Sequence, residues 1–263
     1  ATSIIEKSPD HLWSWKILGS VFGETGRVSE ALVANQNAAR LDTKDPIIHY
    51  NVGTAMRQLG MFIEAEGSFK RALALDSTLV EAHNNLGITL RELGRLKEAE
   101  ASYRQAMAIG TGYIEAHSNL LFLYAGFNYE ASLYLKEARD YGLRIAQTVT
   151  SRFSSWSCEE EHQTLRVGFV SGDLSNHPVG YFLEGLLNEL GRSKLELFAY
   201  PTKLLEDELT LRIKPHFTAW QPLASISDKE SANLIHSDGI HILIDLSGHT
   251  AESRLPIFSW KPA

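Results

Sequence analysis

The chain has 263 residues, of which 44% are hydrophobic and 22% charged, a composition that excludes a disordered chain and leaves room for two folded domains. Its net charge of −7 gives no basic surface for nucleic acid or an anionic membrane, and no apolar run reaches the roughly 18 residues of a membrane span. Cys158 is the only cysteine, which excludes an intrachain disulfide and a cysteine-based metal cluster and favours a reducing, cytoplasmic location.

The first half of the chain repeats itself with a period of 34 residues. Four columns are identical in three consecutive repeats: Gly19, Gly53 and Gly87; Gly26, Gly60 and Gly94; Ala31, Ala65 and Ala99; and Ala38, Ala72 and Ala106. The first glycine and the two alanine columns predict helices that cross closely, because larger side chains would not fit there. The second glycine predicts a left-handed residue that ends the first helix of each pair. A helix–turn–helix unit of this length resembles the tetratricopeptide (TPR) repeat, an all-α solenoid that binds other polypeptides.

We assign the TPR repeats to residues 1–127. Apolar residues recur on the packing face of the first helix of each unit, at Leu18, Val52, Leu86 and Leu120. Residues 112–126 begin a fourth unit, although Leu121 replaces the first glycine there.

One polar column also follows the 34-residue period. This asparagine column consists of Asn51, Asn85 and Asn119. The first helices of TPR units line the concave face of the superhelix, where an asparagine offers both a donor and an acceptor to an extended peptide backbone. The column therefore predicts a peptide-binding groove. The alternative is that these side chains bond only to neighbouring helices.

After residue 127 the repeat register ends. Residues 128–164 predict a helical connection followed by a polar linker. Over residues 165–263, apolar runs alternate with amphipathic segments, which predicts a Rossmann-like α/β lobe with a parallel sheet that is incomplete at its C-terminus. The predicted strands are 165–171, 195–200, 217–221 and 239–247, and the predicted helices are 179–190, 205–214, 228–239 and a segment starting at Ala251.

Ligands of an open parallel sheet bind beyond the carboxyl ends of its strands, and two such ends are rich in polar residues. The first is SGDLSNHPVG (171–180), in which Pro178 is well suited to the first position of a helix and His177 to its cap. The positive end of the helix favours a neutral imidazole, the form that can act as a base. The alternative is that His177 only caps the helix.

The second polar end is DLSGHT (245–250), where Asp245, His249 and Thr250 should lie at the same sheet edge and could face His177. Histidines and aspartates nearby raise the possibility of a metal site. The spacing of His236, Asp238 and His241 matches no standard ligand pattern, so we expect no metal. By its pattern alone, His241 is a core residue. The sequence contains no G-x-S-x-G nucleophile elbow, P-loop or G-x-G-x-x-G fingerprint.

Both halves together resemble one family. The repeats with EAHNNLG and LRELGRLKEAEASYRQA, followed by LRVGFVSGDLSNHPVGYFLE and DGIHILIDLSGHT, are similar to the bacterial relatives of O-GlcNAc transferase and SPINDLY. The resemblance implies a TPR superhelix joined to the N-terminal Rossmann-like lobe of a GT-B fold. It implies an inverting glycosyltransferase that moves a sugar from UDP-GlcNAc, or in some members GDP-fucose, to Ser or Thr hydroxyls of proteins.

The resemblance also implies roles for individual residues. The family's active-site histidine lies in an N-H-P motif, which here makes His177 catalytic and places Asn176 and Pro178 in the substrate site. The G-[HY]-T segment of the same cleft corresponds to Gly248, His249 and Thr250. In some relatives a histidine at the position of His241 also reaches the cleft, whereas its place early in the strand argues for the core.

The implied partners are an acceptor protein in the TPR groove, a nucleotide sugar, and a second catalytic lobe. The family binds the nucleotide mainly through that second lobe, which would lie beyond Ala263 or on another chain. We therefore expect residues 1–263 alone to be inactive, and we expect neither a metal nor a cofactor. Two alternatives stay open: an O-fucosyltransferase of the SPINDLY type, and a TPR adaptor whose α/β part is only structural.

Overall fold

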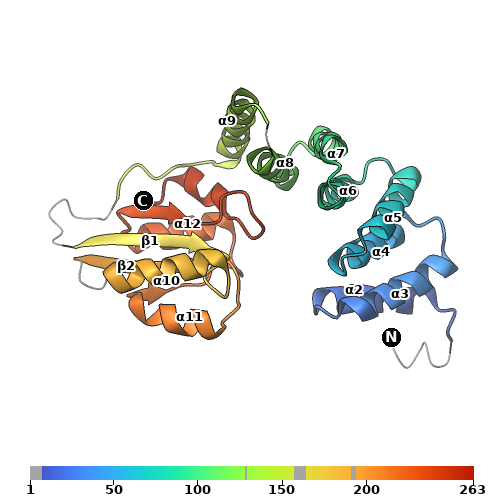
Figure 1. The fold of residues 1–263 in the computed structure, drawn as a ribbon, viewed down its shortest axis with the longest axis horizontal. Helices are drawn as coiled ribbons and strands as arrows, with labels where there is room; N and C mark the ends of the chain where they lie inside the picture. The colour runs from blue at the N-terminus through green and yellow to red at the C-terminus, as the bar shows by residue number, and fades with distance from the viewer. Residues whose placement is uncertain (1–7, 128, 157–163, 191–193) are drawn as a thin grey trace. The chain divides into compact units, whose positions relative to one another are not determined.

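The computed structural model describes residues 8–127, 129–156, 164–190 and 194–263 (Figure 1). Cys158 lies outside the described residues. The chain forms two compact units, Ala1–Tyr134 and Leu135–Ala263. None of the described helices is both long and apolar enough to cross a membrane.

The first unit is a series of antiparallel helix pairs, which confirms the predicted TPR repeats. Its helices are α2 (Leu12–Glu24), α3 (Val28–Leu41), α4 (Pro46–Gln58), α5 (Phe62–Leu75), α6 (Val80–Glu92), α7 (Leu96–Ile109) and α8 (Ile114–Gly126). The turn within each pair contains a glycine of the second glycine column. Gly26, Gly60 and Gly94 have φ angles of +74°, +77° and +72°, a conformation that side chains with a Cβ rarely adopt.

The first glycine column and the two alanine columns lie where the two helices of a pair touch. A Cβ on Gly53 would lie 2.8 Å from the ring of Phe69, and one on Gly87 would lie 2.6 Å from the ring of Tyr103. The alanines at Ala65 and Ala99 are fully buried in the same interfaces. The small residues therefore let each pair approach closely, as the sequence predicts.

The helix α9 (Ala131–Thr148) lies within the predicted helical connection and is a single helix of 18 residues. Its buried residues include Tyr141 and Ile145. Residues 149–156 contain no regular element, and Phe153 and Trp156 both bond to the C-terminal segment. The Phe153 N–H donates to the Trp260 carbonyl at 3.0 Å.

The second unit contains a four-stranded sheet in which every pair of neighbouring strands is parallel, as predicted. The strands are β1 (Leu165–Ser171), β2 (Leu195–Pro201), β3 (Ala219–Trp220) and β4 (Ile242–Asp245), in the order β3-β2-β1-β4. The helices are α10 (Pro178–Leu190), α11 (Glu208–Ile213), α12 (Asp228–Ser237) and the 3₁₀ helices η1 (Lys214–His216) and η2 (Leu255–Trp260).

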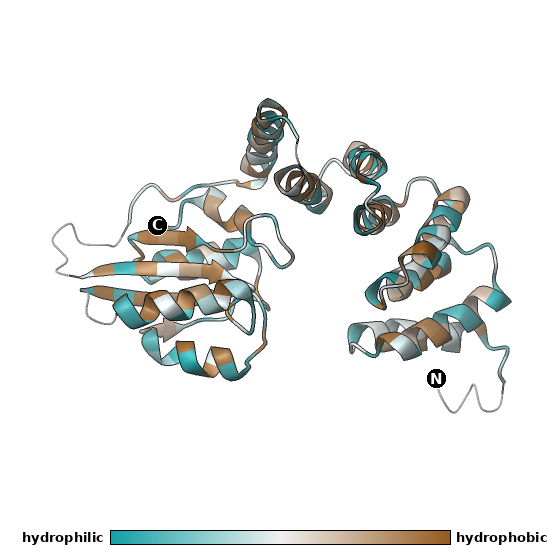
Figure 2. Ribbon diagram, in the orientation of Figure 1, coloured by the Kyte–Doolittle hydropathy of each residue, from teal (hydrophilic) through white to brown (hydrophobic). Residues whose placement is uncertain are grey.

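Each face of the sheet has its own core, and the strands are among the most hydrophobic segments in Figure 2. One core joins the strands to α10 and α11 through residues such as Phe169, Leu187 and Ile213. The other joins them to α12 and η2 through residues such as Tyr200 and Ile235. Helices on both faces are what a sheet of parallel strands requires.

The predicted helix from Ala251 is wrong. The chain turns at Ala251 and Glu252 and then forms the short 3₁₀ helix η2. Glu252 has a φ of +62°, which no α-helix accommodates, and its carbonyl accepts a hydrogen bond from the Thr202 hydroxyl at 2.7 Å. Arg254 then anchors the turn by donating to the carbonyls of Leu223 and Ile226. Long-range contacts therefore override the local helical pattern.

Candidate active site

The β1–α10 loop and the β4–η2 loop meet at the carboxyl edge of the sheet. The hydroxyl oxygens of Ser171 and Ser247 are 3.2 Å apart, and the Gly172 N–H donates to the Ser247 hydroxyl at 3.3 Å. Both serines are buried. The Ser171 hydroxyl also accepts the Asp173 N–H at 3.0 Å, so one pair of serines links the two loops and shapes the first. The strand order makes this possible, because β1 and β4 are neighbours.

His177 immediately precedes α10, which begins at Pro178 as the sequence predicts. Its Nδ1 accepts the Val179 N–H at 3.3 Å, so the ring caps the first turn of the helix. The Asp173 carboxylate lies 3.8 Å from the same nitrogen, beyond hydrogen-bond distance. The side chain is 44% exposed, which leaves the ring accessible to a substrate. A neutral ring whose Nδ1 accepts a hydrogen bond carries its proton on Nε2.

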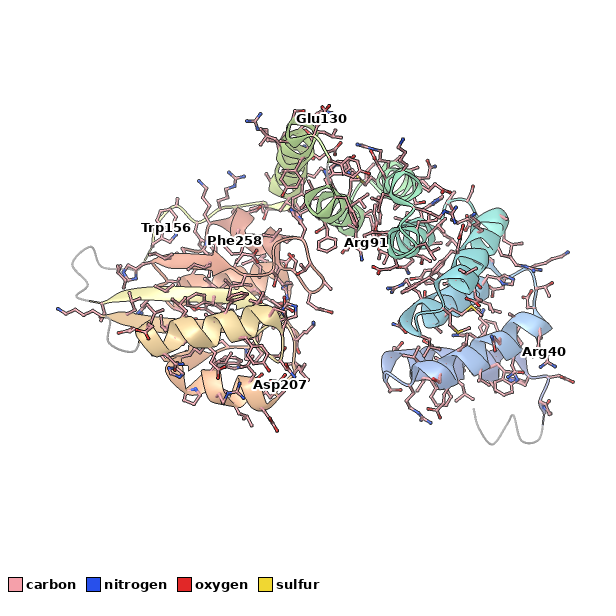
Figure 3. The ribbon with its side chains drawn as sticks, in the orientation of Figure 1. Arg40, Arg91, Glu130, Trp156, Asp207 and Phe258 are labelled. Carbon is pink, nitrogen blue, oxygen red and sulfur yellow. The ribbon has the colours of Figure 1, made fainter. Side chains whose placement is uncertain are left out.

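A carboxylate from another element holds the loop in front of His177. Asp207, at the N-cap of α11 and labelled in Figure 3, accepts the Asn176 N–H through Oδ2 at 2.6 Å and the Thr210 N–H through Oδ1 at 3.0 Å. The Asn176 side-chain oxygen accepts the Tyr181 hydroxyl at 3.0 Å. Sequence reasoning missed Asp207. An aspartate before a short predicted helix indicates a cap, but nothing local indicates that it reaches Asn176.

Asp207 gives the α/β unit an acid-sensitive contact. The backbone N–H groups of Asn176 and Thr210 lower the pKa of Asp207. A carboxylate whose pKa is lower in the folded than in the unfolded state stabilises the fold. This stabilisation is complete above the unfolded pKa of about 3.9 and is lost as the pH falls through the folded pKa. We expect Asp207→Asn to lower the Tm at neutral pH and to lose that deficit in acid. Thermal unfolding of both proteins across this range measures the difference, and a deficit that stays constant with pH would contradict the assignment.

The β4–η2 loop is shaped by Asp245 and Ser247. Asp245 Oδ2 accepts the Gly248 N–H at 2.6 Å, and burial raises the pKa of Asp245. Its other oxygen, Oδ1, is buried with no hydrogen-bond partner among the described residues. Gly248 has a φ of +58°, and the Thr250 hydroxyl donates to the Ser247 carbonyl at 2.8 Å. This turn presents Gly248 and Thr250 on the loop that Ser247 links to the His177 loop.

His249 lies on the same turn, but its ring packs edge-on against Tyr141 of α9 with the ring centroids 4.8 Å apart. The contact with α9 could not be predicted from the DLSGHT segment. The structure thus brings the N-H-P loop (Asn176, His177 and Pro178) and the G-H-T turn (Gly248, His249 and Thr250) to one edge of the sheet.

His241 does not join them. Its N–H donates to the Arg166 carbonyl at 3.0 Å, and its Nδ1 accepts the Arg166 N–H at 3.1 Å, at the amino end of β1. The length of a seven-residue strand, about 20 Å, separates that end from the edge that carries His177. In this structure His241 therefore has the structural role that its position early in the strand predicts.

The other residues weighed for a metal site have partners of their own. The His236 ring stacks on Phe153 at a centroid distance of 3.8 Å. Asp238 accepts hydrogen bonds from the Tyr200 hydroxyl at 2.7 Å and the Gln221 amide at 2.8 Å. Over the described ranges, no three His, Cys, Asp or Glu residues are grouped so as to hold a metal ion.

In the TPR unit the three members of the asparagine column differ. The Asn85 amide donates to the Tyr50 hydroxyl at 3.2 Å, and the Asn119 amide donates to the Asn84 side-chain oxygen at 2.9 Å. These two side chains therefore bond to neighbouring helices, the structural alternative considered above. Asn51 lines a cavity between α2 and α4. The peptide-groove assignment stays a prediction for all three.

Comparisons with known proteins cover both units. Residues 143–263 match Glycosyl transferase family 41, and residues 45–112 match the Tetratricopeptide repeat family. A probable UDP-N-acetylglucosamine–peptide N-acetylglucosaminyltransferase SPINDLY of Arabidopsis thaliana is 28% identical over 130 residues, which are 48% of this chain and 14% of that protein. A UDP-N-acetylglucosamine–peptide N-acetylglucosaminyltransferase of Caenorhabditis elegans is 34% identical over 106 residues, 38% of this chain and 9% of that protein.

The similarity extends to structure. The chain superposes on a mutant O-GlcNAc transferase of Thermobaculum terrenum with a TM-score of 0.83 and 28% identity, covering 96% of this chain and 49% of the other. The chain thus spans about half the length of that structure and a much smaller share of the curated relatives.

Proposed function

Because this chain belongs to the O-GlcNAc transferase/SPINDLY-like family of glycosyltransferases with TPR repeats, we propose that it forms part of a protein O-glycosyltransferase. The reaction moves a sugar, GlcNAc from UDP-GlcNAc, to Ser or Thr hydroxyls of a protein held by the TPR groove. The observation that carries the proposal is the meeting of the N-H-P loop and the G-H-T turn at the carboxyl edge of a family 41 lobe, where sheets of this kind bind ligands. The enzyme works in the cytoplasm.

His177 is the residue that acts on the substrate. With Nδ1 occupied by the Val179 N–H, the neutral ring carries a proton on Nε2, which can donate a hydrogen bond to an oxygen of the acceptor or the sugar. To act instead as a general base through Nε2, the ring must adopt the other tautomer and give up the bond to Val179. The geometry supports the donor role, in which His177 orients the hydroxyl, UDP leaves from the sugar, and the hydroxyl proton passes to the leaving phosphate or to water.

Asn176, Pro178, Gly248, His249 and Thr250 complete the substrate site in this proposal. The Asn176 N–H and side chain are both bonded within the lobe, which gives His177 a fixed position before substrate arrives. The diphosphate of the donor is held by the second lobe, beyond residue 263 or on another chain. Residues 1–263 alone are therefore expected to transfer no sugar.

The donor is tested on the complete protein, including its second lobe. We expect UDP-GlcNAc to raise its Tm and GDP-fucose to leave the Tm unchanged, because only a ligand that binds the folded state stabilises it. Mass spectrometry of an acceptor protein incubated with each donor then shows which sugar is transferred. Stabilisation and transfer by GDP-fucose alone would identify an O-fucosyltransferase, and transfer from neither donor would favour a non-catalytic TPR adaptor.

A further inference from the structure

The three repeats carry different residues at one buried position of the second helix, which is not among the four identical columns. In each helix pair, one side chain of the second helix lies directly beneath the first glycine of the pair. The pairs are Gly19 over Asn35, Gly53 over Phe69 and Gly87 over Tyr103. Phe69 and Tyr103 fill this space with an aromatic ring, whereas Asn35 places a smaller polar amide there. The first pair therefore places a polar group beneath its glycine, where the next two pairs place an aromatic ring.

A cavity of about 250 Å³ lies at this position, between α2 and α4. We call it the polar cavity. Asn35 lines it and is only 4% exposed, and Asn51 and Thr54 line it from α4. The Thr54 hydroxyl is buried without a hydrogen-bond partner within the described part of the chain. Buried polar groups are normally satisfied, so this hydroxyl, which lines the cavity with the two asparagine amides, calls for a polar ligand.

An apolar cavity lies next to the polar one. It has a volume of about 340 Å³ and is lined by Ile47, Leu79 and Ala82, with Glu81 and Tyr50. Tyr50 lines both cavities, and the hydrogen bond from Asn85 holds its hydroxyl. Asn85 therefore holds in place the Tyr50 side chain, which lines both the polar and the apolar cavity.

We propose that the polar cavity binds an uncharged polar side chain of the polypeptide in the TPR groove, namely Ser, Thr, Asn or Gln, with an apolar side chain in the neighbouring cavity. This inference rests on the proposed acceptor groove and specifies its sequence preference. The two amides and the hydroxyl supply both donors and acceptors, so a side chain that only donates, such as Lys, or only accepts, such as Glu, would leave some of them unpaired. Glu24, the one charged residue of the lining, is exposed and accepts a hydrogen bond from the Ser20 hydroxyl. Side chains two residues apart on an extended chain share a face, which sets the spacing between the two preferred residues.

The probe is a set of synthetic nonapeptides with an alanine background, one fixed leucine and a varied residue two positions before or after it. The varied residue is Ser, Thr, Asn, Gln, Ala, Lys or Glu, and binding to the 263-residue chain is measured by fluorescence polarisation. We expect Ser, Thr, Asn or Gln to bind about tenfold more tightly than Ala, Lys and Glu, the effect of one to two hydrogen bonds. Equal binding of all seven, or a preference for Lys or Glu, would overturn the inference.

Two variants connect the preference to the cavity. Asn35→Leu and Thr54→Val should reduce the tenfold preference to less than twofold and leave the preference for leucine intact. The matched control is Gln36→Leu, an exposed neighbour on the same helix, which should bind as the wild type does. The fold accepts an apolar residue at position 35, since Phe69 and Tyr103 occupy the equivalent positions, and circular dichroism checks this for each variant.

The results separate this inference from the proposed function. Binding with a polar preference that survives both substitutions would overturn the inference alone. Failure of the wild-type chain to bind any of the peptides would overturn the inference together with the acceptor groove.

Discussion

Replacement of His177 with alanine is expected to lower the rate of sugar transfer by the complete protein by about 10²–10⁴-fold, the range for loss of a positioned acid, base or hydrogen-bond donor. His177 is exposed enough to meet a substrate, and its ring is held by the Val179 N–H at the start of α10. The proposed acceptor groove belongs to the TPR unit and His177 to the other unit, so peptide binding should be unchanged. Transfer to an acceptor peptide and peptide affinity are measured on the same preparation.

Controls decide between loss of the site and loss of the fold. His216→Ala removes an exposed histidine of the same lobe and should leave transfer unchanged. His177→Gln keeps a side-chain N–H but cannot act as a base. Partial activity in His177→Gln supports the donor role, and activity as low as that of His177→Ala supports the base. Full activity of His177→Ala would refute the catalytic assignment of His177.

Replacement of Gly180 with alanine is expected to destabilise the α/β unit by about 1–3 kcal/mol, the usual cost of adding a methyl group to a filled space. A Cβ at this position would lie 2.2 Å from the Ser175 carbonyl oxygen and 2.5 Å from Leu209. The backbone of Ser175 is part of the loop that carries His177, and its carbonyl accepts the His177 N–H at 2.6 Å. The added methyl group must therefore move this loop or the helix α10.

Gly185 on the same helix is the matched control. A Cβ there meets no atom within 4 Å, so Gly185→Ala should stabilise the protein by about 0.5–1 kcal/mol through helix propensity. Urea unfolding, with hydrogen exchange of residues 165–190 to assign the transition to the α/β unit, measures both changes. Gly180→Ala should also reduce transfer by the complete protein without weakening peptide binding. If the two variants were equally stable, the added methyl group at position 180 would fit without the clash that the structure predicts.

Local patterns in the sequence predicted most of the fold. The 34-residue period identified the TPR repeats, and the apolar runs identified all four strands, with β1 predicted at its observed bounds. These features depend on side-chain periodicity and on turn residues such as Gly60 and Pro178, which act within one or two turns of chain. The helix predicted from Ala251 failed because contacts with distant residues hold Glu252 in a left-handed conformation.

The candidate site likewise has some features that the sequence predicts and others that only the structure shows. By itself, the sequence determined that His177 caps a helix that follows the carboxyl end of a strand and that the G-H-T turn follows another strand. The rule that parallel strands end at one edge was enough to bring them together. Only the tertiary structure decided that Asp207 holds Asn176, that His249 packs on Tyr141 and that His241 pairs with Arg166 at the far edge. The physical reason is that strand order and register set hydrogen bonds between residues far apart in the chain, and local side-chain patterns do not encode either.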